Sequence, residues 1–166
     1  VAPIAYGAIG DAYVELGNLK DALIFYNKAA KISANEFTTP IYLMKVGFVH
    51  EQNGDYNKAL DYYIKSLSYV KNKVITIGNI ASCLRKIYKD DDLFYYKLIK
   101  FFDCSNKDSL YLFAKILTNN KLYEKSLLCV DKLFEFDDKD NWSAVACCNK
   151  LGLKQAPCAV NVIPLI

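Results

Sequence analysis

The sequence has one histidine, one methionine and one tryptophan among its 166 residues. It also lacks a glycine-rich phosphate loop, a Gly-x-Ser-x-Gly element and a His-Glu-x-x-His element. A catalytic base needs a nucleophile and an orienting partner, and no spacing in the sequence nominates either for His50. We therefore expect no enzymatic activity, no cofactor and no bound metal, and we interpret His50 as a core-facing residue with a satisfied ring nitrogen.

Long apolar runs and clustered charges are also absent. No stretch approaches the roughly 18 apolar residues of a membrane-spanning helix, although 53% of the residues are hydrophobic. The formal net charge is +3, and the lysines are scattered among aspartate and glutamate. A nucleic-acid-binding protein carries a clustered basic face, so we expect neither a nucleic-acid partner nor a transmembrane segment in this chain.

The six cysteines all lie at or beyond residue 83, and none forms a Cys-x-x-Cys element. Metal and redox sites need defined ligand spacings, whereas a free cysteine is commonly a small buried hydrophobe. Structural thiols favour a reducing compartment, so we expect a cytoplasmic protein, with a periplasmic or membrane-anchored full-length protein as the alternative. An enzyme or thiol-redox protein that uses Cys147 and Cys148 is a further functional hypothesis.

A duplication dominates the first half: residues 3–37 and 40–74 are near-copies at a constant offset of 37. Random overlap of two such windows would give about two identities, so a repeated structural unit is the better explanation. Such a unit must stack on its neighbours to bury its apolar face. The matching positions are Pro3 and Pro40, Ile4 and Ile41, Gly10 and Gly47, Gly17 and Gly54, Ala22 and Ala59, Leu23 and Leu60, Tyr26 and Tyr63, and Lys28 and Lys65.

Small residues in each copy lie where two helices must touch. Gly10 and Ala22 let the backbones approach closely, and Tyr26 fills the space beside them. Gly17 offers the left-handed conformation that ends a helix. Thr39 is a candidate N-cap for the helix that Pro40 opens. These features predict two antiparallel helix pairs.

These residues resemble the tetratricopeptide repeat, which has a period of about 34 residues. The first copy reads Tyr6, Ile9-Gly10, Tyr13, Gly17, Ala22, Tyr26 and Ala29, and the second reads Leu43, Val46-Gly47, His50, Gly54, Tyr56, Ala59, Tyr63 and Ser66. Residues 5–13 and 35–40 are further similar to tetratricopeptide proteins of Bacteroidetes-type bacteria. The resemblance implies an all-α, right-handed solenoid of about four antiparallel helix pairs, followed by a C-terminal helix and tail.

The pattern decays after residue 72. Residues 77–88 and 93–102 predict a third pair across the turn at 89–92, and residues 114–133 fit a degenerate fourth unit. A different all-helical domain is the alternative for this half. We expect two clear repeats at 1–72, two degenerate pairs at 73–138, and a C-terminal helix with an apolar tail at 139–166. Packing of this tail on the last pair is the favoured arrangement, and self-association through it is an alternative.

In the resembled family, first helices of successive pairs line a concave groove that holds a peptide. Here their shared sides combine methionine and aromatic residues with a few charges, which suits peptide capture. The alternative is that Met44 and Phe48 pack on adjacent helices or on the tail. The family's lysine and asparagine clamp for chaperone carboxylates is absent from the first two repeats. The candidate groove residues are Gly7, Asp11 and Val14, then Met44, Phe48 and Glu51, then Ser82 and Arg85, and finally Tyr111 and Lys115.

The resemblance therefore implies a non-enzymatic scaffold that binds a protein or peptide and helps to assemble a complex. The alternative is a peptide-sensing regulatory module of a larger protein. The first residue is Val1 and no signal-peptide pattern follows it, so we expect the chain to start inside a longer protein or after processing.

Overall fold

The computed structural model describes residues 2–32 and 34–135, and every regular element in these ranges is an α-helix. Contacts divide the chain into two compact units, residues 1–98 and 99–166. The expected all-α architecture of adjacent helix pairs is confirmed, whereas the predicted C-terminal helix and tail at 139–166 lie outside the described residues. The helices are α1 (Ala2–Glu15), α2 (Leu19–Lys31), α3 (Thr38–Gln52), α4 (Tyr56–Leu67), α5 (Val74–Ile87), α6 (Asp91–Ile99), α7 (Lys107–Asn119) and α8 (Tyr123–Glu135).

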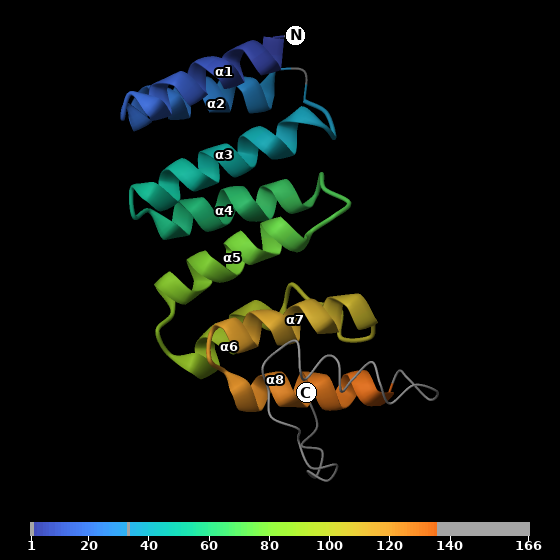
Figure 1. Ribbon diagram of the computed structural model, residues 1–166. Helices are drawn as coiled ribbons and strands as arrows, with labels where there is room; N and C mark the ends of the chain where they lie inside the picture. The colour runs from blue at the N-terminus through green and yellow to red at the C-terminus, as the bar shows by residue number, and fades with distance from the viewer. Residues whose placement is uncertain (1, 33, 136–166) are drawn as a thin grey trace. The chain divides into compact units, whose positions relative to one another are not determined.

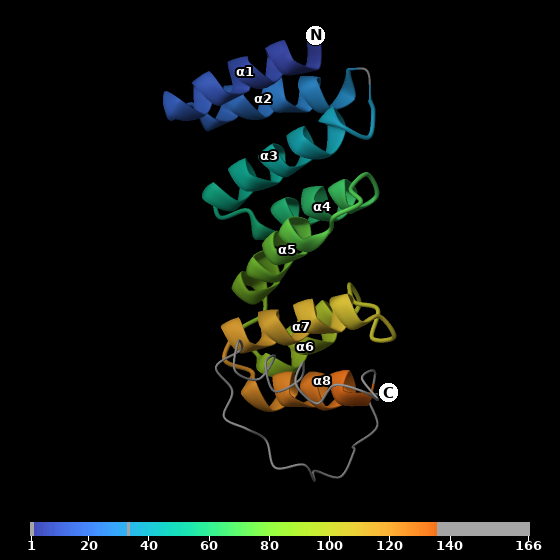
Figure 2. The same cartoon turned by 45° about the vertical axis from the view of Figure 1, so that its right-hand side comes forward.

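In the first unit, α1 to α5 stack in the order of the chain (Figures 1 and 2). Each helix packs on the next one, and α1 also touches α3. The turns inside the first two pairs contain Gly17 and Gly54, with φ of +72° and +78°. After each glycine, a backbone amide returns to a carbonyl at the end of the preceding helix: Asn18 to Tyr13 at 2.8 Å, and Asp55 to His50 at 2.9 Å. The predicted helix-ending role of both glycines is confirmed.

The two helices of each pair meet at a glycine that faces a tyrosine ring. A Cβ atom added to Gly10 would lie 2.5 Å from Tyr26, and one added to Gly47 would lie 2.6 Å from Tyr63. Both tyrosines are buried. No real side chain fits at such distances, so the close approach that the small residues predicted is present in both copies.

The N-terminus of α3 differs from the sequence-based expectation. The helix begins at Thr38, so Thr39 lies inside it and is not its cap. Instead, Asn35 Oδ1 accepts the amides of Phe37 and Thr38, both at 2.8 Å. The Thr39 hydroxyl accepts the Asn35 amide at 2.9 Å. The asparagine can reach two amides because it precedes the helix by a short turn, which a simple cap pattern does not predict.

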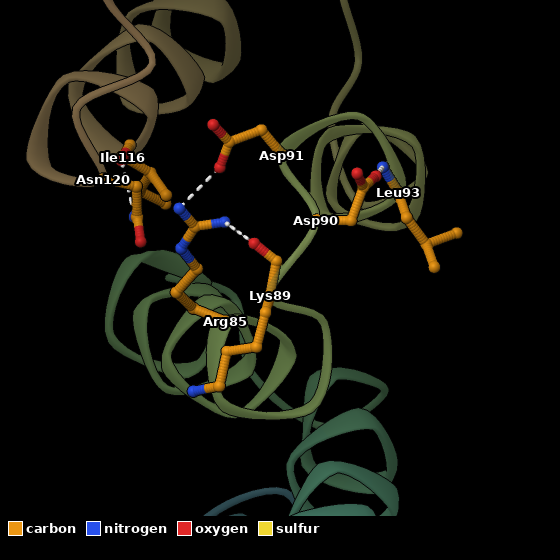
Figure 3. Close-up of polar contacts among 7 residues, drawn as sticks. All are labelled: Arg85, Lys89, Asp90, Asp91, Leu93, Ile116 and Asn120. Atoms are coloured by element: carbon orange, nitrogen blue, oxygen red, sulfur yellow. Dashed lines mark hydrogen bonds and ion pairs between the residues drawn. The ribbon is translucent and has the colours of Figure 1, made fainter.

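The range of the predicted third pair contains α5, which packs on α4, and the shorter α6. Helix α6 begins at Asp91, and Asp90 Oδ1 accepts the Leu93 amide at 2.8 Å (Figure 3). Arg85 of α5 donates to Asp91 Oδ1 at 2.6 Å and to the Lys89 carbonyl at 3.4 Å. One arginine thus ties the end of α5 to the turn and to the first residue of α6.

The second unit contains α7 and α8, which pack on each other. Ser126 of α8 is fully buried and donates to the Ala114 carbonyl of α7 at 2.9 Å. The connection between α7 and α8 includes Lys121 with φ of +65°. In Figure 3, Asn120 caps this end of α7 by donating to the Ile116 carbonyl at 2.8 Å. The two helices lie where the degenerate fourth unit is expected, while the domain boundaries at 72 and 138 stay predictions.

The glycine and tyrosine contact predicts that Gly47→Ala destabilises the protein. The new methyl group would overlap the buried Tyr63 ring, and overpacking of this kind costs about 1–3 kcal/mol. Gly78→Ala is the matched control, because Gly78 also lies inside a helix but has open space at its Cβ position. That control should be stabilising by about 0.5–1 kcal/mol, since alanine is the better helix former. Urea unfolding followed by circular dichroism measures both, and equal effects would contradict the close contact.

Candidate functional site

The candidate site is the side of α1, α3 and α5 that carries Asp11, Lys45, Phe48, Glu51 and Ser82, which we call the first-helix face. Two sets of hydrogen bonds, which we call polar links, connect the helices on this face. The first link is centred on Asp11 of α1. The Tyr26 hydroxyl of α2 donates to Asp11 Oδ1, and Lys45 Nζ of α3 donates to Asp11 Oδ2 at 2.7 Å. One carboxylate therefore holds together the two helices of the first pair and the first helix of the second pair.

A second link repeats this arrangement one pair further on. Glu51 of α3 accepts the Tyr63 hydroxyl of α4 at 2.9 Å through Oε2, and accepts the Ser82 hydroxyl of α5 at 3.1 Å through Oε1. The offset of 37 relates Asp11 to Phe48 and Glu51 to Val14. The acid thus moves by three residues, about one helical turn, between the two copies, while its bonding roles stay the same.

The protonation states of these groups favour the links. Burial raises the pKa of Asp11, but the hydrogen bonds from Lys45 and Tyr26 and the charge of Lys45 outweigh it, so the net pKa is lowered. Burial and then the hydrogen bond to Asp11 raise the pKa of Tyr26. Burial and then the hydrogen bond to Glu51 raise the pKa of Tyr63 in the same way. Both phenols therefore remain donors at neutral pH, and Asp11 remains an acceptor.

Apolar side chains stay exposed beside these links. Phe48 is 49% exposed and lies on α3 between Lys45, which bonds to α1, and Glu51, which bonds to α5. Ile41 is 51% exposed and precedes Phe48 by seven residues, so both lie on one side of α3. Ile4 of α1, the duplicate of Ile41, is 63% exposed. The first-helix face therefore combines exposed apolar groups with fixed charges.

Three predicted groove residues pack against neighbouring helices. Gly7 is buried, and a Cβ atom there would collide with the Tyr42 ring of α3. Val14 is half-buried against the core cluster of α2 and α3. The Met44 sulfur accepts a hydrogen bond from Thr76 of α5 at 3.6 Å. These residues lie on the predicted side of their helices, yet they contribute to the joints between helices more than to an open surface.

The remaining predicted residues fall into two groups. Arg85 is half-buried, bonds to Asp91 and lies over the Phe94 ring at 5.0 Å. Tyr111 is half-buried and Lys115 is exposed, and both lie on α7 of the second unit. Of the predicted groove residues, Asp11, Phe48, Glu51 and Ser82 lie on the first-helix face. Ser82 was predicted from the less regular second half of the repeat pattern.

Lys45 and the tyrosine hydroxyls are the functional groups that sequence reasoning missed. We considered Lys45 only as a replacement for a clamp asparagine, whereas its ammonium group bonds to both Asp11 oxygens. It is therefore already engaged and does not present a free cation to a carboxylate. The available signal was a lysine and an aspartate on equivalent helix sides in successive copies.

His50 packs on Tyr62, with the rings stacked at 5.5 Å, as expected for a core-facing residue. The expectation that the ring nitrogen of His50 is hydrogen-bonded is wrong for Nδ1. This buried atom has no hydrogen-bond partner and lies 3.7 Å from Asp55 Oδ2. Burial, followed by the charge of Lys58, lowers the pKa of His50. His50 is therefore neutral at pH 7 and acts as a packing residue.

Cys83 and Cys129 do not resemble reactive thiols. Burial raises the pKa of Cys83 to about 12, with Glu51 adding to the shift. Burial also raises the pKa of Cys129 to about 12. Both are protonated at pH 7, and a thiol nucleophile must be a thiolate. Cys147 and Cys148 lie outside the described residues.

Within residues 2–32 and 34–135, no cluster of three or more histidine, cysteine or acidic side chains could hold a metal ion. In the same ranges, none of the helices has the length and hydropathy needed to cross a bilayer.

Comparisons with known proteins agree with this architecture. Residues 4–36 and 41–69 match the family model of the tetratricopeptide repeat. Photosystem I assembly protein Ycf3 of Sorghum bicolor is 36% identical over 61 residues, which is 37% of this chain and 35% of that protein. The protein of the same name from Acaryochloris marina (strain MBIC 11017) is 36% identical over 68 residues, 41% of each chain. The matches thus span well under half of these relatives.

A solved structure shares the fold over a longer range. The tetratricopeptide repeat protein from Parabacteroides merdae ATCC 43184 superimposes with a TM-score of 0.54 over 91% of this chain and 60% of its own. The two sequences are 17% identical, so this likeness concerns the fold alone. The expected similarity to proteins of Bacteroidetes-type bacteria stays a prediction.

The tyrosine links predict that Tyr63→Phe destabilises the first unit. The substitution leaves Glu51 without its 2.9 Å donor and keeps the ring in place, and a hydrogen bond to a charged group is worth about 1.5–3 kcal/mol. Tyr69→Phe removes a hydroxyl from an exposed side chain and is the matched control. Thermal unfolding measures both, and an unchanged midpoint for Tyr63→Phe would contradict the link.

The lowered pKa of Asp11 predicts a pH-dependent contribution to stability. A carboxylate with a depressed folded-state pKa stabilises the fold above its unfolded-state pKa, and this contribution is lost as the pH falls through the folded-state value. The stability gap between the wild type and Asp11→Asn should therefore be full at neutral pH and narrow below the ordinary value of 3.8. Urea titrations at neutral and acidic pH measure this gap. Asp61→Asn, at an exposed position of α4, controls for the loss of one charge, and a gap that widens in acid would contradict the account.

Proposed function

We propose that this chain, in which residues 4–36 and 41–69 are tetratricopeptide repeats, is a non-enzymatic scaffold that binds a protein or peptide partner through the first-helix face. The observation that carries this proposal is the exposure of Phe48 between two polar links. Those links hold α1, α3 and α5 together before any partner arrives. A preorganised receptor spares part of the entropy cost of binding.

The chemistry of the face indicates the kind of partner. Phe48, Ile41 and Ile4 offer apolar area that a partner can bury. Asp11 and Glu51 already accept hydrogen bonds from the protein itself, so they fix the helices and leave the apolar groups to provide most of the affinity. We therefore expect a partner segment with apolar side chains at the contact and polar groups at its rim, as is usual for such interfaces.

The matched relatives and the buried cysteines concern the cellular role and the compartment of the protein. The matched relatives are named as photosystem I assembly proteins, and this supports a role in the assembly of a complex, with no indication of which complex. Cys83 and Cys129 are buried free thiols, which supports a reducing compartment such as the cytoplasm. Because Lys45 already bonds to Asp11, its ammonium group is not free to bind the C-terminal carboxylate of a chaperone. This supports a partner of another kind.

The proposal predicts that Phe48→Arg abolishes partner capture. Loss of a central aromatic residue typically costs at least about 2 kcal/mol, or roughly 30-fold in affinity. The immobilised chain would be used to capture proteins from a lysate of the cells that produce it, with quantitative mass spectrometry of the eluate. Phe37→Arg is the matched control, because Phe37 is 82% exposed and precedes α3 outside the first-helix face.

We expect at least one protein to be retained by the wild type and by Phe37→Arg but lost with Phe48→Arg, and to bind the purified chain directly. Circular dichroism must first confirm that both variants are folded. Equal retention of every captured protein by the two variants would contradict the proposal. The Met44 position is unsuitable for this test, since its contact with Thr76 would confound binding with packing.

A further inference from the structure

The connections between successive helix pairs lie on one side of the first unit. Helices α2 to α5 each pack on a neighbouring helix and alternate in direction. The end of α2 and the start of α3 therefore lie at the same edge of the stack as the end of α4 and the start of α5 (Figures 1 and 2). We call this region the connection edge, and its described residues are 28–32, 34–38 and 65–75.

Positive charge gathers at the connection edge, which carries five exposed lysines and one glutamate, Glu36. In the part of the chain that the structure describes, none of these lysines forms an ion pair. The lysines are far apart in the sequence, and the alternation of helix directions brings them to one edge. They are Lys28 and Lys31 at the end of α2, Lys65 at the end of α4, and Lys71 and Lys73 in the connection to α5.

Exposed apolar side chains lie among these lysines. Phe37, directly before α3, is 82% exposed, and Val74, the first residue of α5, is 50% exposed. The offset of 37 relates these two residues, so each connection presents an apolar group at the same place. Ile75, beside Val74, is 69% exposed. Single exposed apolar residues are common on protein surfaces, but these recur in both copies next to positive charge.

We propose that the connection edge binds the surface of a membrane that contains anionic phospholipids. The negative surface potential of such a membrane attracts the lysines. Phe37, Val74 and Ile75 enter the boundary between headgroups and acyl chains, where apolar groups are buried while neighbouring ammonium groups keep their contact with water. Because both connections lie on one side of the unit, a single flat surface reaches both of them.

The connection edge is separate from the first-helix face. Phe48 follows Phe37 by eleven residues, which is about 16 Å along a helix. Membrane binding at the edge therefore does not depend on the partner proposed for the first-helix face.

Other anionic partners fit the edge less well. A nucleic acid would be attracted to the lysines and could stack on Phe37, but the aliphatic Val74 and Ile75 have no ring to stack on a base. An acidic peptide would bind the lysines but leave Phe37, which projects with 82% of its surface exposed, in contact with water. The interface of a bilayer accepts the charged and the apolar groups together.

Cosedimentation of the full chain with vesicles tests the proposal. The vesicles contain phosphatidylserine and phosphatidylcholine in equal amounts, and vesicles of phosphatidylcholine alone serve for comparison. The double variant Lys71→Gln, Lys73→Gln removes two charges from the edge. Its matched control is Lys20→Gln, Lys86→Gln, which removes two exposed lysines in the first turn of α2 and the last turn of α5, away from the edge.

Phe37→Ser tests the apolar contribution. Leu16→Ser is its matched control, because Leu16 is 78% exposed and lies between α1 and α2, away from the edge. Circular dichroism checks that all variants are folded, and Val74→Ser replaces Phe37→Ser if the latter is not.

We expect the wild type to bind the mixed vesicles and not phosphatidylcholine alone. Binding should weaken at least about tenfold for the lysine variant and severalfold for Phe37→Ser, with both controls unchanged. Absence of binding to the mixed vesicles, or equal loss in the lysine variant and its control, overturns the proposal. Unchanged binding of Phe37→Ser also overturns it, because the edge would then attract any polyanion. Binding of a single-stranded oligonucleotide that depends on Phe37 as well as on the lysines would make nucleic acid the partner and would equally overturn it.

Discussion

The contact between a helix glycine and a buried tyrosine ring is the constraint on which the rest of the first unit depends. Gly10 and Gly47 each leave a space that the ring of Tyr26 or Tyr63 occupies. The ring lies against the first helix of its own pair, and its hydroxyl donates to a carboxylate of that same helix. The glycine thus determines both how closely two helices pack and where a polar donor emerges.

The hydroxyl groups of Tyr26 and Tyr63 connect the packing inside each pair to the first-helix face. Each tyrosine meets a carboxylate on a first helix, and that carboxylate also accepts a hydrogen bond from the first helix of the following pair. The links run through α1, α3 and α5 and hold them in a fixed order. Phe48 lies between the two links on α3 and remains exposed. A face whose polar groups already bond to one another presents its apolar residues as the groups available to a partner.

Features that lie within a single repeat were predicted from the sequence. Contacts between successive repeats were missed. The offset of 37, the turn glycines and the glycine and tyrosine contact follow from local pattern, and the structure contains all of them. The link from Lys45 to Asp11 was missed, because the acid moves by three residues to Glu51 in the second copy and the same residue pair is not repeated there. Helix spacing predicted Met44 as a groove residue, but its sulfur accepts a hydrogen bond from Thr76, so Met44 contributes to the joint between α3 and α5.

A double-mutant cycle between Gly47 and Tyr63 tests the central claim most directly. The free energy of unfolding would be measured for the wild type, Gly47→Ala, Tyr63→Val and the double variant. Because Tyr63→Val removes the ring atoms that an added methyl group would meet, the account predicts that the cost of Gly47→Ala largely disappears in that background, with a coupling of about 1–2 kcal/mol. Strictly additive costs would contradict the account, since they would mean that the glycine is not required by the ring.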